Sequence, residues 1–174
     1  MPISLCNAFV PAARQILGGM TSIVDKAQRY AAEQGRTDAE LMEARLAPDM
    51  WPLPWHVRAC WMHSAYALDQ LAGGEFTPDF SEVPGSWEAM RALLGQADER
   101  LTAATEEEVE AIAGRPVAFI MNGKRLMELE GTRFLLQFNQ PNLYFHATTF
   151  YDILRMIGAP LTKMDFMGQL PVQR

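Results

Sequence analysis

Apolar residues recur every three or four positions along several long segments of this chain, and this helical spacing limits its fold more than any other feature. Residues 8–32 carry such a stripe, from Phe9 to Tyr30, which predicts a helix of about seven turns. The segment 54–72 is apolar around most of its circumference, as is typical of a central helix in a bundle. The same reasoning predicts further helices over 38–46, 87–103, 106–112 and 132–157.

One segment departs from the helical pattern. The apolar runs 117–121 and 125–129 flank Asn122-Gly123, a dipeptide that favours the type I′ turn of a β-hairpin. A hairpin this short is only marginally stable alone, so it should pack on the helices. The expected fold is therefore all-α: an up-down four-helix bundle with a small β-hairpin insert before the last long helix, forming a single domain over residues 1–174.

Composition narrows the classes of function. There are 15 Lys and Arg residues against 21 Asp and Glu, a net charge of −6, and the sequence has no basic cluster to attract nucleic acid or an anionic membrane. It has only two cysteines, Cys6 and Cys60, which favours a reducing compartment. The first residues lack the pattern of a signal peptide, and no run approaches the ~20 apolar residues that span a bilayer. We expect a cytoplasmic protein that binds neither nucleic acid nor membranes.

The familiar sequence motifs of enzymes are absent. The sequence contains no glycine-rich phosphate loop, no nucleophile elbow and no Cys-x-x-Cys pair, which disfavours the common NTPase, dehydrogenase and hydrolase classes. The residues best suited to chemistry are therefore the three histidines.

The second long helix carries two of these histidines. His56, Cys60 and His63 lie at positions i, i+4 and i+7, which places them on one face of a continuous helix. His56 and Cys60 are close enough to share an ion. His56 and His63 would be about 10.5 Å apart along the axis, too far for one metal ion. The alternative interpretation, a buried structural residue, applies most strongly to Cys60 and His63.

The last long helix carries Asn142 and His146, one turn apart. This i, i+4 spacing projects both side chains over the same turn, as in helical metal-binding motifs. If the two helices face each other, His56 would supply a third ligand from across the bundle. An amide oxygen is a poorer ligand than an imidazole or a carboxylate, so the site would be weak. A hydrogen-bonded core histidine is the alternative interpretation of His146.

Two stretches of the sequence resemble a known family. They are FNQPNLYFHATT at 138–149, continued by YDILRMIG at 151–158 and by Lys163-x-Asp165-Phe166-x-Gly168, and ARLAPDMWPL at 44–53. On these motifs the chain resembles, essentially end to end, a bacterial family of unknown function in the DinB-like (YfiT-like) superfamily. The resemblance implies a four-helix bundle, often dimeric, with a three-histidine site for a divalent metal in the metal-binding members.

The resemblance also implies which residues would hold the metal. One histidine of the superfamily site comes from the second helix, and two come from an H-x-x-x-H turn on the last long helix. His146 matches the second histidine of that turn, Asn142 stands where the first is expected, and His56 matches the histidine of the second helix. The departure at Asn142 implies a degenerate or weak site, formed by these three residues, for a divalent metal such as Zn, Ni, Mn or Fe.

Three interpretations of the function remain open. The first is a homodimeric DinB-like protein with this weak site and a small-molecule ligand in the cleft between the second and fourth long helices. The second is a metal-dependent transferase or hydrolase acting on a small molecule, in which the metal activates a water or a thiol. The third is a non-catalytic dimeric interaction module with an apolar dimer face and no metal. The fold by itself does not choose among them.

Overall fold

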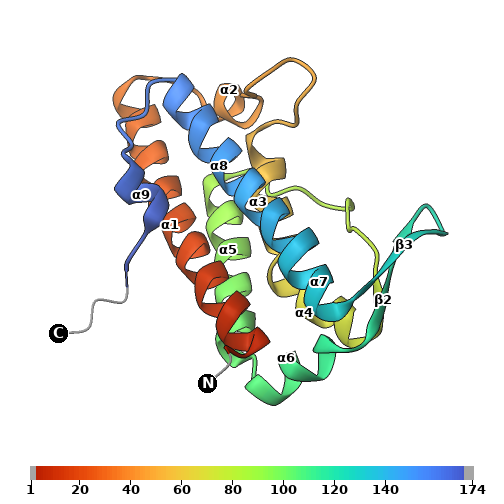
Figure 1. The fold of residues 1–174 in the computed structure, drawn as a ribbon. Helices are drawn as coiled ribbons and strands as arrows, with labels where there is room; N and C mark the ends of the chain where they lie inside the picture. The colour runs from red at the N-terminus through yellow and green to blue at the C-terminus, as the bar shows by residue number, and fades with distance from the viewer. Residues whose placement is uncertain (1–2, 171–174) are drawn as a thin grey trace.

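Helices make up most of residues 3–170, the part of the chain that the computed structural model describes (Figure 1). Their bounds are α1 (Leu5–Glu33), α2 (Asp38–Met42), α3 (Leu53–Met62), α4 (Ala65–Ala72), α5 (Trp87–Ala103), α6 (Glu106–Ala113), α7 (Gly131–Arg133), the π-helix η1 (Phe134–Asn139), α8 (Gln140–Met156) and α9 (Lys163–Met167). A small three-stranded sheet completes the regular structure of this range. The prediction of a mostly helical chain with a β-hairpin is confirmed. None of the described helices is long and apolar enough to cross a membrane.

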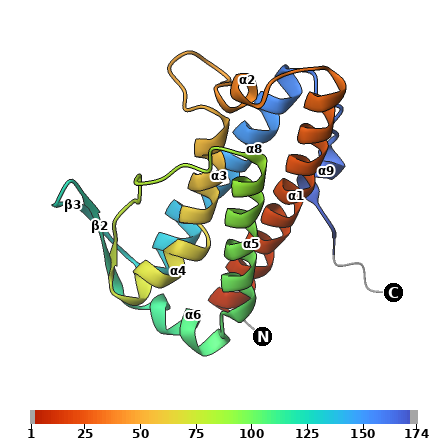
Figure 2. The same cartoon turned by 180° about the vertical axis from the view of Figure 1, so that it is seen from behind.

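The longest helices pack against one another along their length. α1 contacts α5, α8 and α9, and α3 contacts α5 and α8; Figures 1 and 2 show this arrangement from opposite sides. The apolar stripe of α1 is buried among these helices, where Phe9, Ile23 and Val24 are inaccessible to solvent. Removing this apolar surface from water is the main force that holds the helices together. It also places α3 against α8, and these two helices carry His56 and His146.

The second long helix is broken, contrary to the predicted continuous helix over 54–72. It ends as α3 and resumes as α4. Between them Ser64 has φ −123° and ψ −92°, and its hydroxyl donates to the carbonyl of Cys60 at 2.6 Å. A serine side chain bonded to a nearby backbone group competes with the helical ladder. His63 precedes the break, and its N–H still donates to the carbonyl of Ala59 at 2.9 Å, so the break changes the direction of the chain only after His63.

The last long helix begins with a π-helical segment. The helix predicted over 132–157 is instead the succession of α7, η1 and α8. Pro141 lies two residues after the end of η1, in the first turn of α8. Its ring lacks an N–H group and clashes with the carbonyl four residues earlier, which interrupts the regular α-helical ladder. A π-helix holds more residues per turn, so it changes which side chains face the core. Asn139 at its end is fully buried, whereas Asn142 is only partly buried.

A β-hairpin follows α6, as predicted. Strand β2 (Pro116–Met121) pairs antiparallel with β3 (Lys124–Glu130). Asn122 and Gly123 between them have φ values of 51° and 71°, the positive values that a type I′ turn requires. A short strand that the sequence did not predict, β1 (Glu75–Phe76), pairs parallel with β2. Parallel pairing joins segments that are far apart in the chain, so no local turn pattern announces it.

Gly131, where β3 meets α7, has no room for a side chain. A β-carbon there would overlap the carbonyl oxygen of Ile112, and the N–H of Gly131 donates to the carbonyl of Arg115 at 2.8 Å. We expect Gly131→Ala to lower the free energy of unfolding by about 2–3 kcal/mol, because the backbone on both sides must shift. Urea unfolding followed by circular dichroism measures this loss.

Gly95→Ala on α5 is the matched control for this substitution. No atom lies within 4 Å of the position that its β-carbon would take. Because alanine is the better helix former, this change should be neutral or stabilising by up to about 1 kcal/mol. Equal losses of stability in the two variants would contradict the steric argument.

Candidate functional site

His56 of α3 and His146 of α8 meet in the interior of the protein. Their Nδ1 atoms are 3.0 Å apart, and their ring centres are 5.2 Å apart with planes inclined by 43°. Only 1% of His56 and 8% of His146 is exposed. The packing of α3 against α8 therefore brings together two of the three residues that the sequence singled out, although 90 positions separate them in the chain.

Trp51 holds His56 from the other side. Its backbone carbonyl lies 3.1 Å from Nε2 of His56. A carbonyl oxygen can only accept a hydrogen bond, so a neutral His56 carries its proton on Nε2 and a lone pair on Nδ1. The proton that joins the two Nδ1 atoms therefore belongs to His146. Trp51 lies in the non-helical Pro48–Pro52 segment before α3, so its carbonyl is not used by a helix and is free to face His56.

His63 lies against the same imidazole, a contact that the sequence analysis did not anticipate. Its ring centre is 6.0 Å from that of His146, with the planes within 6° of parallel. Its Nδ1 is 2.9 Å from Oδ1 of Asn139. His63 precedes the break at Ser64 and still donates its N–H to the carbonyl of Ala59 at 2.9 Å, so it keeps the position two turns after His56 that the sequence predicted.

Asn142 is not joined to either histidine by a hydrogen bond within the described residues. Its Nδ2 donates to the carbonyl of Phe138 in the preceding turn, at 2.7 Å, which leaves its Oδ1 as the atom that could serve as a ligand. Asn139 is the amide that reaches a histidine instead. The π-helix brings Asn139 into the core, and the sequence analysis did not consider this residue.

Cys60 is fully buried in α3, one turn after His56. Its thiol points to the carbonyl of Leu143 at 3.7 Å. Burial raises the pKa of the thiol well above its usual range. The sulfur therefore stays protonated at pH 7, which suits a small core residue better than a metal ligand or a nucleophile.

Burial lowers the pKa of all three histidines. It brings the pKa of His63 to about 4, although the bond to Asn139 acts in the opposite direction. It brings the pKa of His146 to about 3, with a further contribution from the neighbouring His56 and His63. The pKa of His56 is also lowered by burial, against the effect of the Trp51 carbonyl. At pH 7 all three imidazoles are neutral, which is the form that binds metals.

The donor set around this pair consists of neutral nitrogen and amide groups. Within residues 3–170, no three or more His, Cys, Asp or Glu side chains lie close enough together to hold a metal ion. Imidazole suits Zn, Ni, Cu and Fe. His56 and His146, whose Nδ1 atoms are 3.0 Å apart, therefore supply two of the ligands that a metal ion needs. A third donor, such as an amide oxygen or water, would have to complete the site.

Aromatic side chains surround the histidine pair on its solvent side. The indole of Trp51 stacks on His146, with ring centres 5.7 Å apart and planes within 11°. Trp55 and Phe80 pack on Trp51, and Phe145 meets His146 edge to face. We call these four residues the aromatic rim. Trp51, Phe80 and Phe145 are 41%, 42% and 55% exposed, so the rim offers an apolar surface next to buried polar nitrogens.

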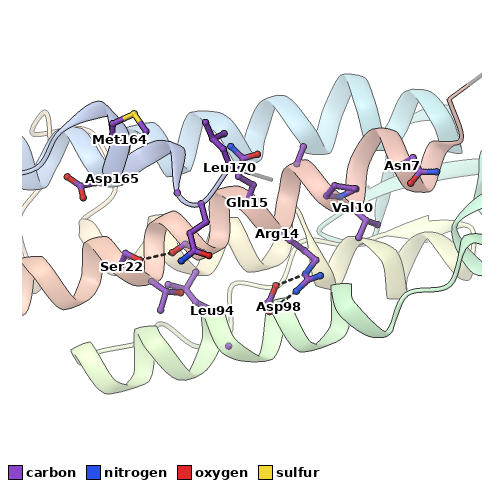
Figure 3. A pocket seen from close by; sticks show the side chains of 17 residues that line it. Asn7, Val10, Arg14, Gln15, Ser22, Leu94, Asp98, Met164, Asp165 and Leu170 are labelled. Atoms are coloured by element: carbon purple, nitrogen blue, oxygen red, sulfur yellow. Dashed lines mark hydrogen bonds and ion pairs between the residues drawn. The ribbon is translucent and has the colours of Figure 1, made fainter. Parts of the chain in front are cut away.

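A separate groove of about 1130 Å³ runs along α1, between α5 and the segment that contains α9. Figure 3 shows Arg14 and Asp98 meeting in this groove, where they form an ion pair at 2.7 Å. Gly18 and Gly95 add no side chain to its walls. None of the three histidines lines it, so it is distinct from the histidine pair.

Comparisons with known proteins agree with the resemblance in the sequence motifs. The family model DUF1993, described as a domain of unknown function, matches residues 5–167. No curated protein matches the chain. A crystal structure of a DinB family member protein from Shewanella denitrificans is similar over 98% of this chain and 95% of that chain, with a TM-score of 0.83 and 26% identity. The chain belongs to the DUF1993 family and resembles a DinB family protein in its structure.

Proposed function

We propose that this protein binds a divalent metal ion weakly between α3 and α8, through Nδ1 of His56 and Nδ1 of His146. The observation that supports this is the 3.0 Å separation of the two atoms. Two nitrogens bound at 2.0–2.1 Å to a tetrahedral ion lie about 3.3 Å apart, so the pair needs to open only slightly. Both rings are neutral and buried, and they come from two different helices. The chemistry supplied would be that of a Lewis acid, with Zn, Ni, Mn or Fe as candidate ions.

Asn142 is the proposed third ligand, through Oδ1. It precedes His146 by one turn, and its amide nitrogen is already engaged with the carbonyl of Phe138. An amide oxygen is a weak donor for these metals, and within residues 3–170 no carboxylate or thiolate completes a group of three donors there. We therefore expect affinity well below that of a three-histidine site.

The wider architecture proposed here is the up-down four-helix bundle of DinB proteins. Its helices would be α1, the broken pair α3–α4, α5 and α8. α1 and α3 each contact both α5 and α8, so the order of the helices around the bundle would be α1, α5, α3, α8. The similarity to the Shewanella denitrificans structure supports the proposal. We further propose that residues 1–174 form a single domain that acts as a cytoplasmic homodimer, in keeping with the free state of Cys6 and Cys60.

The aromatic rim supports two extensions of this proposal. As the entrance to a metal site, it would accept a small apolar or aromatic molecule beside His146, which suits a metal-dependent transferase or hydrolase. As an exposed apolar surface, it suits a non-catalytic dimeric interaction module, in which the histidine pair is simply a buried hydrogen bond. Metal binding separates these two possibilities.

The test is the metal content of the untagged protein by elemental mass spectrometry, followed by calorimetric titration of the metal-free protein with Zn²⁺ and Ni²⁺. We expect His146→Gln and His56→Gln each to weaken binding at least 100-fold, because even changes outside the ligand shell cost 10–100-fold. Tyr144→Phe is the control, since this partly exposed hydroxyl on α8 bonds only to Gln140 among the described residues.

If the wild-type protein binds neither ion, or if both histidine variants bind as tightly as the wild type, the proposed metal site is wrong. Metal-free protein that is nevertheless dimeric in light scattering would then support the interaction module.

A further inference from the structure

Residues 77–83, between β1 and α5, run along the surface beside α3, and none of their side chains is buried (Figure 2). We call this segment the strap. Among the described residues, no backbone–backbone hydrogen bond joins the strap to another part of the chain. An open cavity of about 330 Å³ is lined by residues 82–85 on one side and by α5 on another, so the strap is incompletely packed. Segments with few buried contacts and no backbone ladder open at a low cost in free energy.

Three side chains of α3 and α4, spaced four residues apart, hold the strap in place. The hydroxyl of Tyr66 donates to the carbonyl of Thr77 at 2.8 Å. The sulfur of Met62 accepts the N–H of Asp79 at 3.2 Å. Arg58 donates twice to Asp79, from Nη2 to Oδ2 at 2.7 Å and from Nε to the carbonyl at 3.4 Å. Opening the strap therefore requires the loss of a few side-chain bonds and of no backbone ladder.

The strap reaches the histidine pair through Phe80. The indole of Trp51 covers one face of His146, with ring centres 5.7 Å apart. Two other rings pack on this indole: Trp55 at 5.3 Å, which belongs to α3, and Phe80 at 5.9 Å, edge to face, which the strap carries. Phe80 is therefore the ring contact of Trp51 that can leave while α3 and α8 stay packed together.

We infer that the strap is a lid, held closed by Arg58, whose opening lets Trp51 turn away from His146 and admits a ligand to the histidine pair. The carbonyl of Trp51 is bonded to His56, so the indole can turn about its side-chain bonds while its backbone stays in place. Phe80 remains exposed even when it packs on Trp51, so little apolar burial opposes its release. Lids of this kind control access to many ligand sites. This role rests on the proposed function, which supplies the ligand, but the opening itself requires no metal.

Acylation of the histidines by diethyl pyrocarbonate measures this access in the metal-free protein. The reagent attacks an imidazole nitrogen that carries a lone pair, as Nε2 of the neutral His146 does, and peptide mass spectrometry follows each histidine separately. We expect Phe80→Ala to speed the modification of His146 at least about 10-fold at pH 7, because the ring that holds the indole is gone. His63 is the internal reference, since its ring packs on Phe76 and Phe138, and its rate should stay within about twofold.

Asp79→Asn tests the bond that holds the lid closed. Asparagine keeps an acceptor oxygen for Ser81 but removes the charge that pairs with Arg58. We expect His146 to react roughly fivefold faster than in the wild type, the effect of losing one partly exposed ion pair. The increase should be smaller than in Phe80→Ala, because the ring of Phe80 is still present to close on the rim.

Leu126→Ala is the control, because it also shortens an exposed apolar side chain, but on the β-hairpin. It should leave all three rates unchanged. Unchanged modification of His146 in Phe80→Ala overturns the lid. Equal acceleration of His146 and His63 also overturns it, since the whole fold would then be opening. If the rates follow the expected pattern but the wild-type protein binds no Zn²⁺, the metal site is wrong and the lid stands. If Zn²⁺ binds and the rates do not follow it, the lid alone is wrong.

Discussion

Lowering the pH of the metal-free protein from 7 to 5 is expected to cost about 4 kcal/mol of unfolding free energy, a large share of the roughly 5–15 kcal/mol typical of a domain. His63 and His146 are buried, and their pKa values are lowered to about 4 and about 3. In the unfolded chain both return to about 6.5. Each residue therefore contributes about 2 kcal/mol to the loss at pH 5. His56, whose pKa is also lowered, adds to it.

The direction of the effect follows from proton uptake. Below about pH 6.5 the unfolded chain binds protons that the folded protein excludes, so stability is full above this pH and falls as the pH drops toward the folded-state values. Carboxylates act in a lower range, because unfolded Asp and Glu titrate near pH ~4. The pKa values of Asp79 and Asp165 are lowered by their hydrogen bonds and ion pairs, so their contribution is lost only in that lower range. The interval from 7 to 5 thus isolates the histidines.

Urea unfolding at a series of pH values, with a chelator present, measures this dependence. His146→Gln should remove about half of it, since one of the two largest contributions disappears. Tyr144→Phe should leave it unchanged. An unfolding free energy that stays constant between pH 7 and 5 would mean that the histidines are not neutral and buried in solution.

Replacing Trp87 is expected to cause the largest loss of stability from a single side chain far from the histidine pair. Trp87 is the first residue of α5, follows the N-cap Ser86, and is fully buried. Its indole N–H donates to Asp38 of α2 at 2.8 Å, which ties α2 to the start of α5. Trp87→Ala should lower the free energy of unfolding by about 3–5 kcal/mol, because the cavity adds to the lost apolar transfer energy.

Two further variants divide this loss into its parts. Asp38→Ala removes the hydrogen bond together with an acidic side chain in the first turn of α2, and should cost about 1–2 kcal/mol. Trp87→Phe keeps much of the ring, so its loss of unfolding free energy should lie between those of the two other variants. Denaturant unfolding measures all three. If Trp87→Ala costs no more than Asp38→Ala, the burial of the indole contributes nothing, and this explanation fails.

Most of the helices and the hairpin could be predicted from the sequence, because each depends on neighbouring residues. The segment 87–103 shows its helix through a local apolar stripe and an N-cap serine, and the structure has the same bounds. Asn122-Gly123 predicts the hairpin because its backbone tolerates the positive φ values of the turn. The sequence also placed His56 and His146 on two apolar helices, but their approach to 3.0 Å depends on the packing of α3 against α8.

Other features depend on contacts between distant segments, and only the tertiary structure decided them. The break at Ser64 was missed because a continuous apolar pattern runs through it, and the contact of His63 with His146 was missed because it joins two helices. The π-helix before Pro141 exchanges Asn142 for Asn139 as the amide that reaches a histidine. Strand β1 pairs with a segment far along the chain.

The sequence by itself therefore determined the helical segments, the hairpin and the placement of His56 and His146 on apolar helices, because backbone preference and the periodicity of burial are local properties. The tertiary structure decided the proton arrangement around these histidines. The positions of the His56, His63 and His146 rings are set by the packing of α3, η1 and α8, and a one-residue shift in any of these elements would change them.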